Sequence, residues 1–437
     1  MNVISINCKL NNDDVFSPSE EAIEINLLKK NKYHYTFFRD ILFEGVPRTP
    51  FKIAPEGLDL LFLSMLVYYA DRRIKREDFP DGWTRKFKLY VPVIAIDIWN
   101  ENRGLVIEML SFLSGDSWDI EFREREENAI EKKLNDKYDK MKGFPNKYSK
   151  LCMLSGGLDS YIGAIDLLSV DLEILFVGHY GGGSGVTGPQ KLVKKSLMKE
   201  YSVEERCFFN FNASPINGVE DTTRTRSFMF FAHAISLASG FDKPTPLYIP
   251  ENGLISLNIP LSISRLGSSS TRTTHPYYME LLQGLITNLG FQTELRNPYQ
   301  FMTKGEMINE CIDSSFLEST IPLTMSCSHP DYGRYAGESK PRHCGTCYPC
   351  LIRRSALGYS HFSDPTDYRD IDFTANQARK NLSVYKKSIV EYSTFSEIKK
   401  YMRIQLSGKL KCRLPEFKSL YERGMDELSN LLEKYEA

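Results

Sequence analysis

The chain has 437 residues, which is enough to bury sizeable hydrophobic cores and indicates two or three domains. Its hydrophobic content of 42% and charged content of 25% are ordinary for a soluble globular protein. Because 55 basic and 56 acidic side chains nearly cancel, the composition disfavours a general nucleic-acid or membrane-surface binder.

The first residues, MNVISINCKLNNDDVF, show no basic segment followed by a long apolar core, so we expect no secretory signal. The longest apolar stretch, residues 58–70, is too short to span a bilayer and is typical of a buried helix. Four of the nine cysteines fall within residues 327–350, which favours a metal site over disulfides. We therefore expect a cytoplasmic protein.

Residues 1–125 predict an α+β domain without a catalytic motif. A strong helix is predicted near residues 57–72, and strands are predicted within 85–99 and 117–126. Residues 126–149 are rich in charge and end in Gly-Phe-Pro-Asn, which predicts a solvated helix and a linker between domains.

Buried strands alternate with helices from residue 150 onward. Short apolar runs predict four strands, and helical patterns between them predict three helices. The predicted strands are 151–154, 172–180, 206–212 and 246–253, and the helices are 160–169, 188–201 and 224–240. This alternation indicates an α/β fold with a parallel sheet over 150–362. Residues 363–437 predict a helical C-terminal extension.

The segment KLCMLSGGLDSYIGAIDLL places a glycine-rich loop between the first of these strands and a helix. Glycine permits backbone angles and a close approach that a side chain forbids, and the start of a helix attracts anions. The hydroxyls of Ser155 and Ser160 add donors, while Asp159 could hold a divalent cation or cap the helix. The loop lacks the Gly-Lys-Ser/Thr of a Walker motif. We therefore predict a phosphate cradle formed by Ser155, Gly156, Gly157, Leu158, Asp159 and Ser160.

The second motif is a cysteine cluster, Cys327 followed by Cys344, Cys347 and Cys350. Two-residue gaps let neighbouring thiolates meet at one ion, and Cys327 completes a tetrahedron across a sixteen-residue loop. Four thiolates predict structural zinc. An iron–sulfur cluster suits the same spacing and stays open as an alternative.

The sequence SGGLDS resembles the PP-loop of ATP pyrophosphatases, which cleave ATP between its α- and β-phosphates. Together with the cysteine motif and the basic LIRR that follows it, residues 150–360 resemble QueC, the 7-cyano-7-deazaguanine synthase family. The resemblance implies an ATP- and magnesium-dependent carbon–nitrogen ligase that activates 7-carboxy-7-deazaguanine, beside a structural zinc. By position it implies that Arg226, in TRTRSFMFFAHAISLA, touches ATP, and that Lys304, in PYQFMTKGEMI, faces the phosphates.

The chain also departs from QueC. About 150 residues precede the loop, and HYGGG (179–183) stands where QueC has an Asp-Tyr-Gly-Gln run. These features resemble QatC, the QueC-like member of the Qat anti-phage defence systems. That resemblance implies a protein partner, and we hypothesise that residues 1–125 dock it and that its amine accepts the activated carbonyl.

Five further residues are candidate substrate contacts, each with a structural alternative. Glu251 and Asn252 follow a strand and could bind a purine-like edge or form a turn. Arg272 and His275 could grip an anion or cap a helix beginning at Pro276. His179 ends a strand and could bind a ligand or simply pack in the core. Other functions that stay open are ammonia-dependent nitrile synthesis, thiolation with an iron–sulfur cluster, and a non-catalytic nucleotide-binding subunit.

Overall fold

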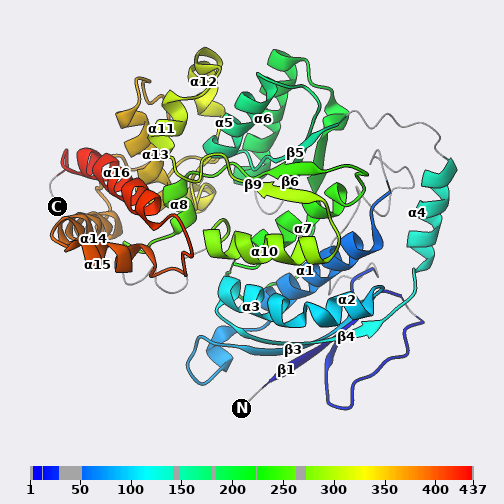
Figure 1. The fold of residues 1–437 in the computed structure, drawn as a ribbon. Coiled ribbons are helices and arrows are strands. Elements are labelled where there is room, and N and C mark those ends of the chain that lie inside the picture. Colours follow the sequence, from blue (N-terminus) through cyan, green and yellow to red (C-terminus); the bar gives the residue numbers. More distant parts are fainter. Residues whose placement is uncertain are drawn as a thin grey trace. The chain divides into compact units, whose positions relative to one another are not determined.

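The fold was analysed in a computed structural model of the whole chain (Figure 1). The structure describes residues 3–11, 13–28, 52–140, 148–179, 184–222, 224–261 and 272–435. By internal packing the chain forms two units, one comprising 1–151, 209–247 and 278–295, and the other 152–208, 248–277 and 296–437. We call them unit 1 and unit 2. The domain boundaries predicted from the sequence remain a proposal beside this division.

The N-terminal part of unit 1 contains a four-stranded sheet of order β2-β1-β3-β4. All three strand pairings are parallel. The strands and helices predicted for this region therefore form a parallel sheet with helices in the connections. Its elements are β1 (Ile4–Lys9), β2 (Ile23–Asn26), α1 (Pro55–Arg73), β3 (Lys86–Val93), α2 (Ile96–Glu101), α3 (Arg103–Ser114), β4 (Ser117–Glu124) and α4 (Ala129–Lys140), with a 3-10 turn at Arg76–Asp78.

Alternating burial gives this sheet one apolar face and one polar face. In β3 the side chains of Phe87 and Leu89 are buried, whereas Lys86 and Lys88 are only partly buried. The strand ends at Val93, earlier than the predicted 85–99, because Ile96 already begins α2 and buries Trp99 on a helix. Helix α1 packs against α7 so closely that a Cβ on Gly57 would lie 2.4 Å from Ser239 Oγ.

The central five-stranded sheet has the order β7-β6-β5-β8-β9. Its elements and connections are β5 (Lys150–Met153), α5 (Leu158–Leu168), β6 (Ile174–His179), α6 (Ser184–Tyr201), β7 (Phe208–Phe211), α7 (Arg226–Ala238), β8 (Thr245–Tyr248), α8 (Gly253–Leu257), α10 (Pro276–Asn288) and β9 (Thr293–Arg296), with a 3-10 turn at Glu205–Cys207. The α/β class with parallel sheets is thereby confirmed. Strands β5, β6 and β7 are added successively toward one edge of the sheet, and β8 and β9 toward the other edge. The order of the strands therefore reverses between β5 and β8, and open α/β sheets bind ligands at such a switch point.

The rest of unit 2 is helical. It comprises α11 (Lys304–Asn309), α12 (Ser314–Thr320), α13 (Tyr348–Tyr359), α14 (Asn376–Ser393), α15 (Glu397–Ile404) and α16 (Leu414–Leu432), with 3-10 turns at Ile321–Leu323 and Tyr332–Ala336. The predicted helical C-terminal region is confirmed, and its helices share an apolar core with α8 and α13 (Figure 1). In the part of the chain that the structure describes, no helix is both long and apolar enough to cross a membrane.

Candidate functional site

The glycine-rich loop lies between β5 and α5 in unit 2. Gly156 has a φ of +83°, a conformation that L side chains rarely adopt. A Cβ at this position would also lie 2.9 Å from Gln190 Cγ and 3.0 Å from its backbone nitrogen. The carbonyl of Gly156 accepts a hydrogen bond of 3.0 Å from the N–H of Met325. Backbone conformation and crowding therefore both require glycine here.

Two serine hydroxyls close the loop on itself. The Oγ atoms of Ser155 and Ser160 lie 3.0 Å apart, and Ser160 Oγ also donates to the carbonyl of Gly157 at 3.0 Å. The N–H of Gly157 donates to Ser155 Oγ at 3.3 Å. Leu158 buries its side chain completely, so only its backbone can face a ligand. The first turn of α5 has N–H groups without helical partners, which can bind an anion such as a phosphate.

Three neighbouring strands bring Asp159, Asn252 and Lys304 together. Asp159 follows β5, Asn252 follows β8 and Lys304 follows β9. Asp159 Oδ1 lies 3.0 Å from Lys304 Nζ, and its Oδ2 accepts from Asn252 Nδ2 at 2.7 Å. All three residues are buried. The switch point of the sheet thus holds a buried ion pair that includes Asp159 of the glycine-rich loop.

Glu251 adds a second carboxyl group to this cluster. Burial is the largest influence on both acids and raises their pKa values. For Asp159 the charge of Lys304 and hydrogen bonds from Glu251 and Asn252 outweigh it, and the pKa ends below its ordinary value. For Glu251 the charge of Asp159 acts in the same direction as burial, and the pKa is raised well above its ordinary value. The two carboxyl groups therefore titrate unevenly, and Asp159 is the stronger acid of the pair.

Local caps fix the other two members of the cluster. Asn252 is the N-cap of α8, because its Oδ1 accepts from the N–H of Ile255 at 3.0 Å. Lys304 is the first residue of α11, whose capping box joins Thr303 to Glu306. The sequence analysis missed this box, although Thr-x-x-Glu before an apolar run is its signature. The caps of α8 and α11 thus fix the backbone at Asn252 and Lys304.

Two other predicted contacts are Arg226 and His179. Arg226 begins α7 in unit 1, where burial lowers the pKa of its guanidinium and its cation lies 5.3 Å from the Phe230 ring centroid. His179 is buried at the end of β6, and its carbonyl accepts from Gln190 Nε2 at 3.1 Å. The rest of the HYGGG run, 180–183, lies outside the described residues. Roles for Arg226 and His179 in nucleotide or substrate binding remain predictions.

His275 makes the contact of a helix cap. Its Nδ1 accepts from the N–H of Tyr277 at 3.2 Å, at the start of α10. Burial, with a smaller effect from Arg272, lowers the pKa of His275 to about 3, so the imidazole is neutral. Burial also lowers the pKa of Arg272. Residues 268–271 of the same predicted segment lie outside the described residues, and a ligand role for Arg272 and His275 remains a prediction.

The four clustered cysteines form a candidate metal centre. They are Cys327, Cys344, Cys347 and Cys350, and their sulfur atoms all lie within 4.8 Å of one another. Three backbone N–H groups donate to these sulfurs at 3.3 Å, two of them to Cys327 and one to Cys344. Such donors stabilise negative charge on thiolates. The donor set fits a closed tetrahedral zinc site.

Buried basic residues connect this centre to the glycine-rich loop. Arg353 donates to Thr324 Oγ1 at 2.7 Å, and His343 Nε2 lies 3.2 Å from the Thr324 carbonyl. The next residue is Met325, which holds Gly156, and Cys327 follows two positions later. Arg354 donates to the carbonyl of Gly345 at 2.8 Å. The arginines of LIRR therefore brace the cysteine segment, and this segment supports the loop.

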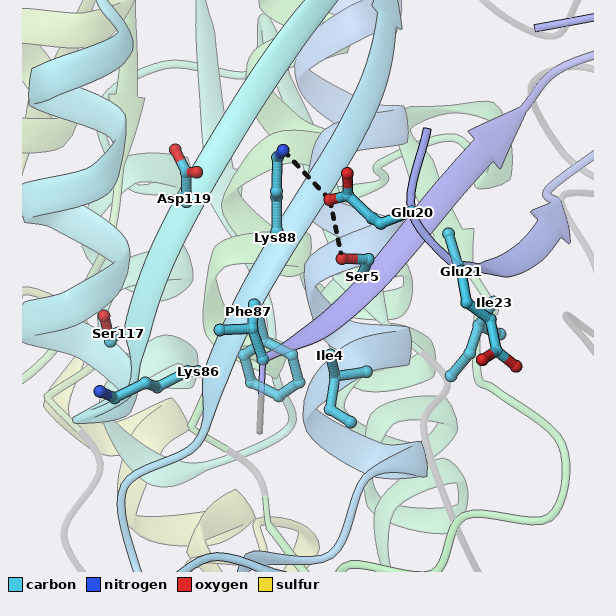
Figure 2. A pocket seen from close by; sticks show the side chains of 12 residues that line it. Ile4, Ser5, Glu20, Glu21, Ile23, Lys86, Phe87, Lys88, Ser117 and Asp119 are labelled. Atoms are coloured by element: carbon cyan, nitrogen blue, oxygen red, sulfur yellow. Dashed lines mark hydrogen bonds and ion pairs between the residues drawn. The ribbon is translucent and has the colours of Figure 1, made fainter. Parts of the chain in front are cut away.

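A groove of about 1000 Å³ opens on the polar side of the sheet in unit 1. Figure 2 shows Lys88 and Ser5 pointing toward Glu20 in its centre. Glu20 Oε1 lies 3.1 Å from Lys88 Nζ and 3.2 Å from Ser5 Oγ. Lys86, Ser117 and Asp119 also line the groove. Both signs of charge are present, which does not suit a polyanion such as nucleic acid.

No protein-family model matches the chain. Part of it is 36% identical over 76 residues to "7-cyano-7-deazaguanine synthase 1" of Mesorhizobium japonicum, which covers 17% of this chain and 28% of that protein. It is also 34% identical over 80 residues to the 7-cyano-7-deazaguanine synthase of Brucella ovis, covering 18% and 29%. The chain thus spans less than a third of the length of these relatives. The similarity to 7-cyano-7-deazaguanine synthases (QueC) is distant and partial.

Proposed function

We propose that this protein is an ATP-dependent enzyme that forms AMP and pyrophosphate, activates the carboxylate of a 7-carboxy-7-deazaguanine-type molecule, and forms a carbon–nitrogen bond. The observation that carries the proposal is the buried Asp159–Lys304 pair behind the Ser155–Ser160 loop. The partial similarity to 7-cyano-7-deazaguanine synthases supports the substrate class. The four-cysteine cluster supports the same assignment.

The proposed reaction uses the loop to stabilise the leaving group. A carboxylate oxygen of the substrate attacks the α-phosphorus of ATP, and the bond from that phosphorus to the bridging oxygen breaks. Pyrophosphate departs with the added negative charge. The hydroxyls of Ser155 and Ser160 and the first N–H groups of α5 would hold that charge, which lowers the barrier most when the donors are fixed in advance. The ammonium group of Lys304, which pairs with Asp159, would neutralise charge on the phosphates.

The second step needs a proton acceptor. An amine attacks the carbonyl carbon of the acyl adenylate, AMP leaves with the broken carbon–oxygen bond, and the attacking nitrogen loses a proton. Asp159 and Glu251 titrate unevenly, because the pKa of Glu251 is raised by burial and by Asp159 while that of Asp159 is lowered, with Lys304 as the main lowering charge. An unevenly titrating pair of this kind can exchange a proton with a substrate.

Two metals fit the residues present. The ionised carboxylate of Asp159 is a hard oxygen donor of the type that Mg²⁺ prefers, and Mg²⁺ neutralises charge on nucleotide phosphates. The four cysteine sulfurs fit Zn²⁺, which supplies structure because no coordination position stays open. Purified protein should be colourless and contain one zinc per chain. A brown protein with visible absorbance would instead favour the iron–sulfur thiolation alternative.

The acceptor that we favour is an amine of a partner protein, in a defence system of the Qat type. The resemblance to QatC motivates this part of the proposal, together with the large part of unit 1 that has no catalytic motif. The groove around Glu20 and Lys88 carries mixed charge that suits a protein surface. If it docks the partner, Lys88→Glu in the full chain should weaken partner capture and leave AMP formation from ammonia unchanged. Unchanged capture would argue against this role of the groove.

The test of the proposed function is a product assay. The purified chain is mixed with magnesium-ATP, 7-carboxy-7-deazaguanine and ammonia, and the nucleotides and bases are followed by mass spectrometry. We expect AMP and pyrophosphate, with an amide or a stalled adenylate. A nitrile product would favour ordinary 7-cyano-7-deazaguanine synthesis. ADP, or no turnover with ammonia or with partner protein, would overturn the proposal and favour a non-catalytic nucleotide-binding subunit.

A further inference from the structure

The C-terminal helix α16 places a buried carboxyl group beside the segment that carries Lys304. Glu427 is 5% exposed, and its Oε1 accepts a hydrogen bond from the hydroxyl of Thr303. These residues are 124 positions apart in the sequence. Thr303 is the N-cap of α11 and immediately precedes Lys304. A residue of the C-terminal extension therefore contacts the cap that fixes the site lysine.

The hydrogen bonds around Thr303 form a continuous chain. Its hydroxyl donates to Glu427, which leaves the lone pairs of Oγ1 to accept from the N–H of Glu306 at 3.1 Å. The N–H of Thr303 donates to Glu306 Oε2 at 2.8 Å. Because a hydroxyl can rotate, its direction depends on the acceptor that it finds. Glu427 supplies that acceptor and so sets the geometry of the cap.

A second contact of α16 strengthens the same junction. Arg423 lies one helical turn before Glu427, and its Nε donates to Glu306 Oε1 at 2.6 Å. Its Nη2 donates to the carbonyl of Phe301 at 2.8 Å. Between these anchors Gly305 has no room for a side chain, since a Cβ would lie 2.6 Å from Glu427 Oε1 and 2.6 Å from Tyr359 Cδ1. Helix α16 thus encloses the start of α11.

From these contacts we infer that Glu427 is a positioning residue for Lys304, so that the C-terminal extension aligns the lysine of the phosphate site. The inference rests on the proposed function for its catalytic readout. A buried carboxyl group is a costly way to stabilise a fold, because its charged form loses hydration. The net pKa of Glu427 is raised to about 7, chiefly by burial; the hydrogen bond with Thr303 lowers it, the charge of Glu306 raises it and the charge of Arg423 lowers it. A carboxyl group that is buried at this cost in free energy fits a role in aligning Lys304.

The decisive comparison is between Glu427→Leu and Glu427→Gln. Leucine removes the acceptor for Thr303, whereas glutamine keeps an oxygen that can accept from the hydroxyl. We expect Glu427→Leu to lower kcat for AMP formation by roughly 10- to 100-fold, the range caused by misplacing a catalytic group by about 1 Å. Glu427→Gln should recover most of this loss. The matched control is Asp426→Asn, an exposed neighbour on the same helix, which should behave like the unmodified protein.

A merely structural role is separated from positioning by a double variant. In a Lys304→Met background the lysine is absent, so Glu427→Leu should cause no further loss of kcat if it acts through Lys304. A further loss of the same size in that background would overturn the inference, and so would Glu427→Leu with unchanged kcat. Zinc content and thermal unfolding of each variant show whether the fold is kept.

Failure of the proposed function would be visible separately, because the unmodified protein would then form no AMP. In that case the affinity of each variant for magnesium-ATP would still test the inference. Glu427→Leu should weaken it about as much as Lys304→Met, and Glu427→Gln should restore it. Equal affinity of Glu427→Leu and the unmodified protein would overturn the inference.

Discussion

The two units each bury a cluster of charged side chains, and the clusters are balanced differently. In unit 1 the cluster contains Arg76, Arg85, Asp71 and Asp116, two cations for two carboxylates. Arg85 is completely buried and donates to both carboxylates and to the carbonyls of Asp71 and Ile74. Its charge and its donors are thus fully compensated within unit 1.

The cluster in unit 2 has two carboxyl groups, Asp159 and Glu251, for the single cation of Lys304. The pKa of the second carboxyl group, Glu251, is raised well above its ordinary value by burial and by the charge of Asp159. A balanced cluster fastens segments of a fold together, whereas an unbalanced one in a ligand-binding crevice can receive a cation or exchange a proton. The comparison therefore predicts a structural role for the cluster in unit 1 and a chemical role for the cluster in unit 2.

The largest expected effect is on stability, from Arg85→Met. Removing this cation leaves the buried carboxylates of Asp71 and Asp116 to share the single cation of Arg76, and such a loss costs about 3–5 kcal/mol of unfolding free energy. Denaturant unfolding measures it. Arg103→Met is the control, because Arg103 belongs to the same unit and its side chain is 48% exposed. A loss below about 1 kcal/mol would mean that the balanced cluster does not fasten the fold.

The next effect is on catalysis, from Asp159→Asn. The amide keeps the shape and the bond to Asn252 but removes the charge that faces Lys304. We expect AMP formation to fall by roughly 10²–10³-fold, the usual cost of removing one electrostatic contact in an active site. Asp166→Asn, on the same helix but bonded to Tyr299, should lose little activity. Equal losses in the two variants would place no special chemistry at Asp159.

Sequence alone predicted the local parts of this site. The loop and the cysteine motif are contiguous, so their residues are brought together by short-range geometry. The helices α5, α6 and α7 were also predictable, since their apolar patterns are long enough to show a helical period. By contrast, β2 and β9 were not predicted, because only one of the four residues in each of these strands is buried and no apolar run marks them.

The rest of the site depends on the order of the strands. Asp159 meets Asn252 because β5 neighbours β8, and nothing local in the sequence specifies this neighbour. The contact of Glu427 with Thr303 spans 124 positions and is invisible to any short window. Glu251 and Asn252 were chosen as strand-end residues, but their different roles follow only from the charges around them.

A third prediction concerns the pH dependence of stability in unit 2. Glu427 has its pKa raised by burial from 4.5 to about 7, so between these pH values the folded state binds a proton that the unfolded state has released. Stability therefore falls as pH rises through this window, by up to about 3 kcal/mol for this group. Glu427→Gln should remove that part of the slope. Unfolding free energies at pH 5 and pH 8 measure it, and an identical slope in the variant would contradict the assigned titration.

The smallest effect is expected on the polar side of the sheet in unit 1, where charges are exposed. Asp119 pairs with Arg103 at 2.5 Å, and both side chains are about half exposed, 50% and 48%. Solvent screens such a pair, so Asp119→Asn should change the unfolding free energy by only about 0–1 kcal/mol, and less in high salt. Thermal unfolding at low and high salt measures it. Charges that contribute little to stability are available for binding a partner, which is the role proposed for the groove. A loss larger than about 1 kcal/mol would show that the charges on this face stabilise the sheet, and it would weaken the case for the groove as a partner surface.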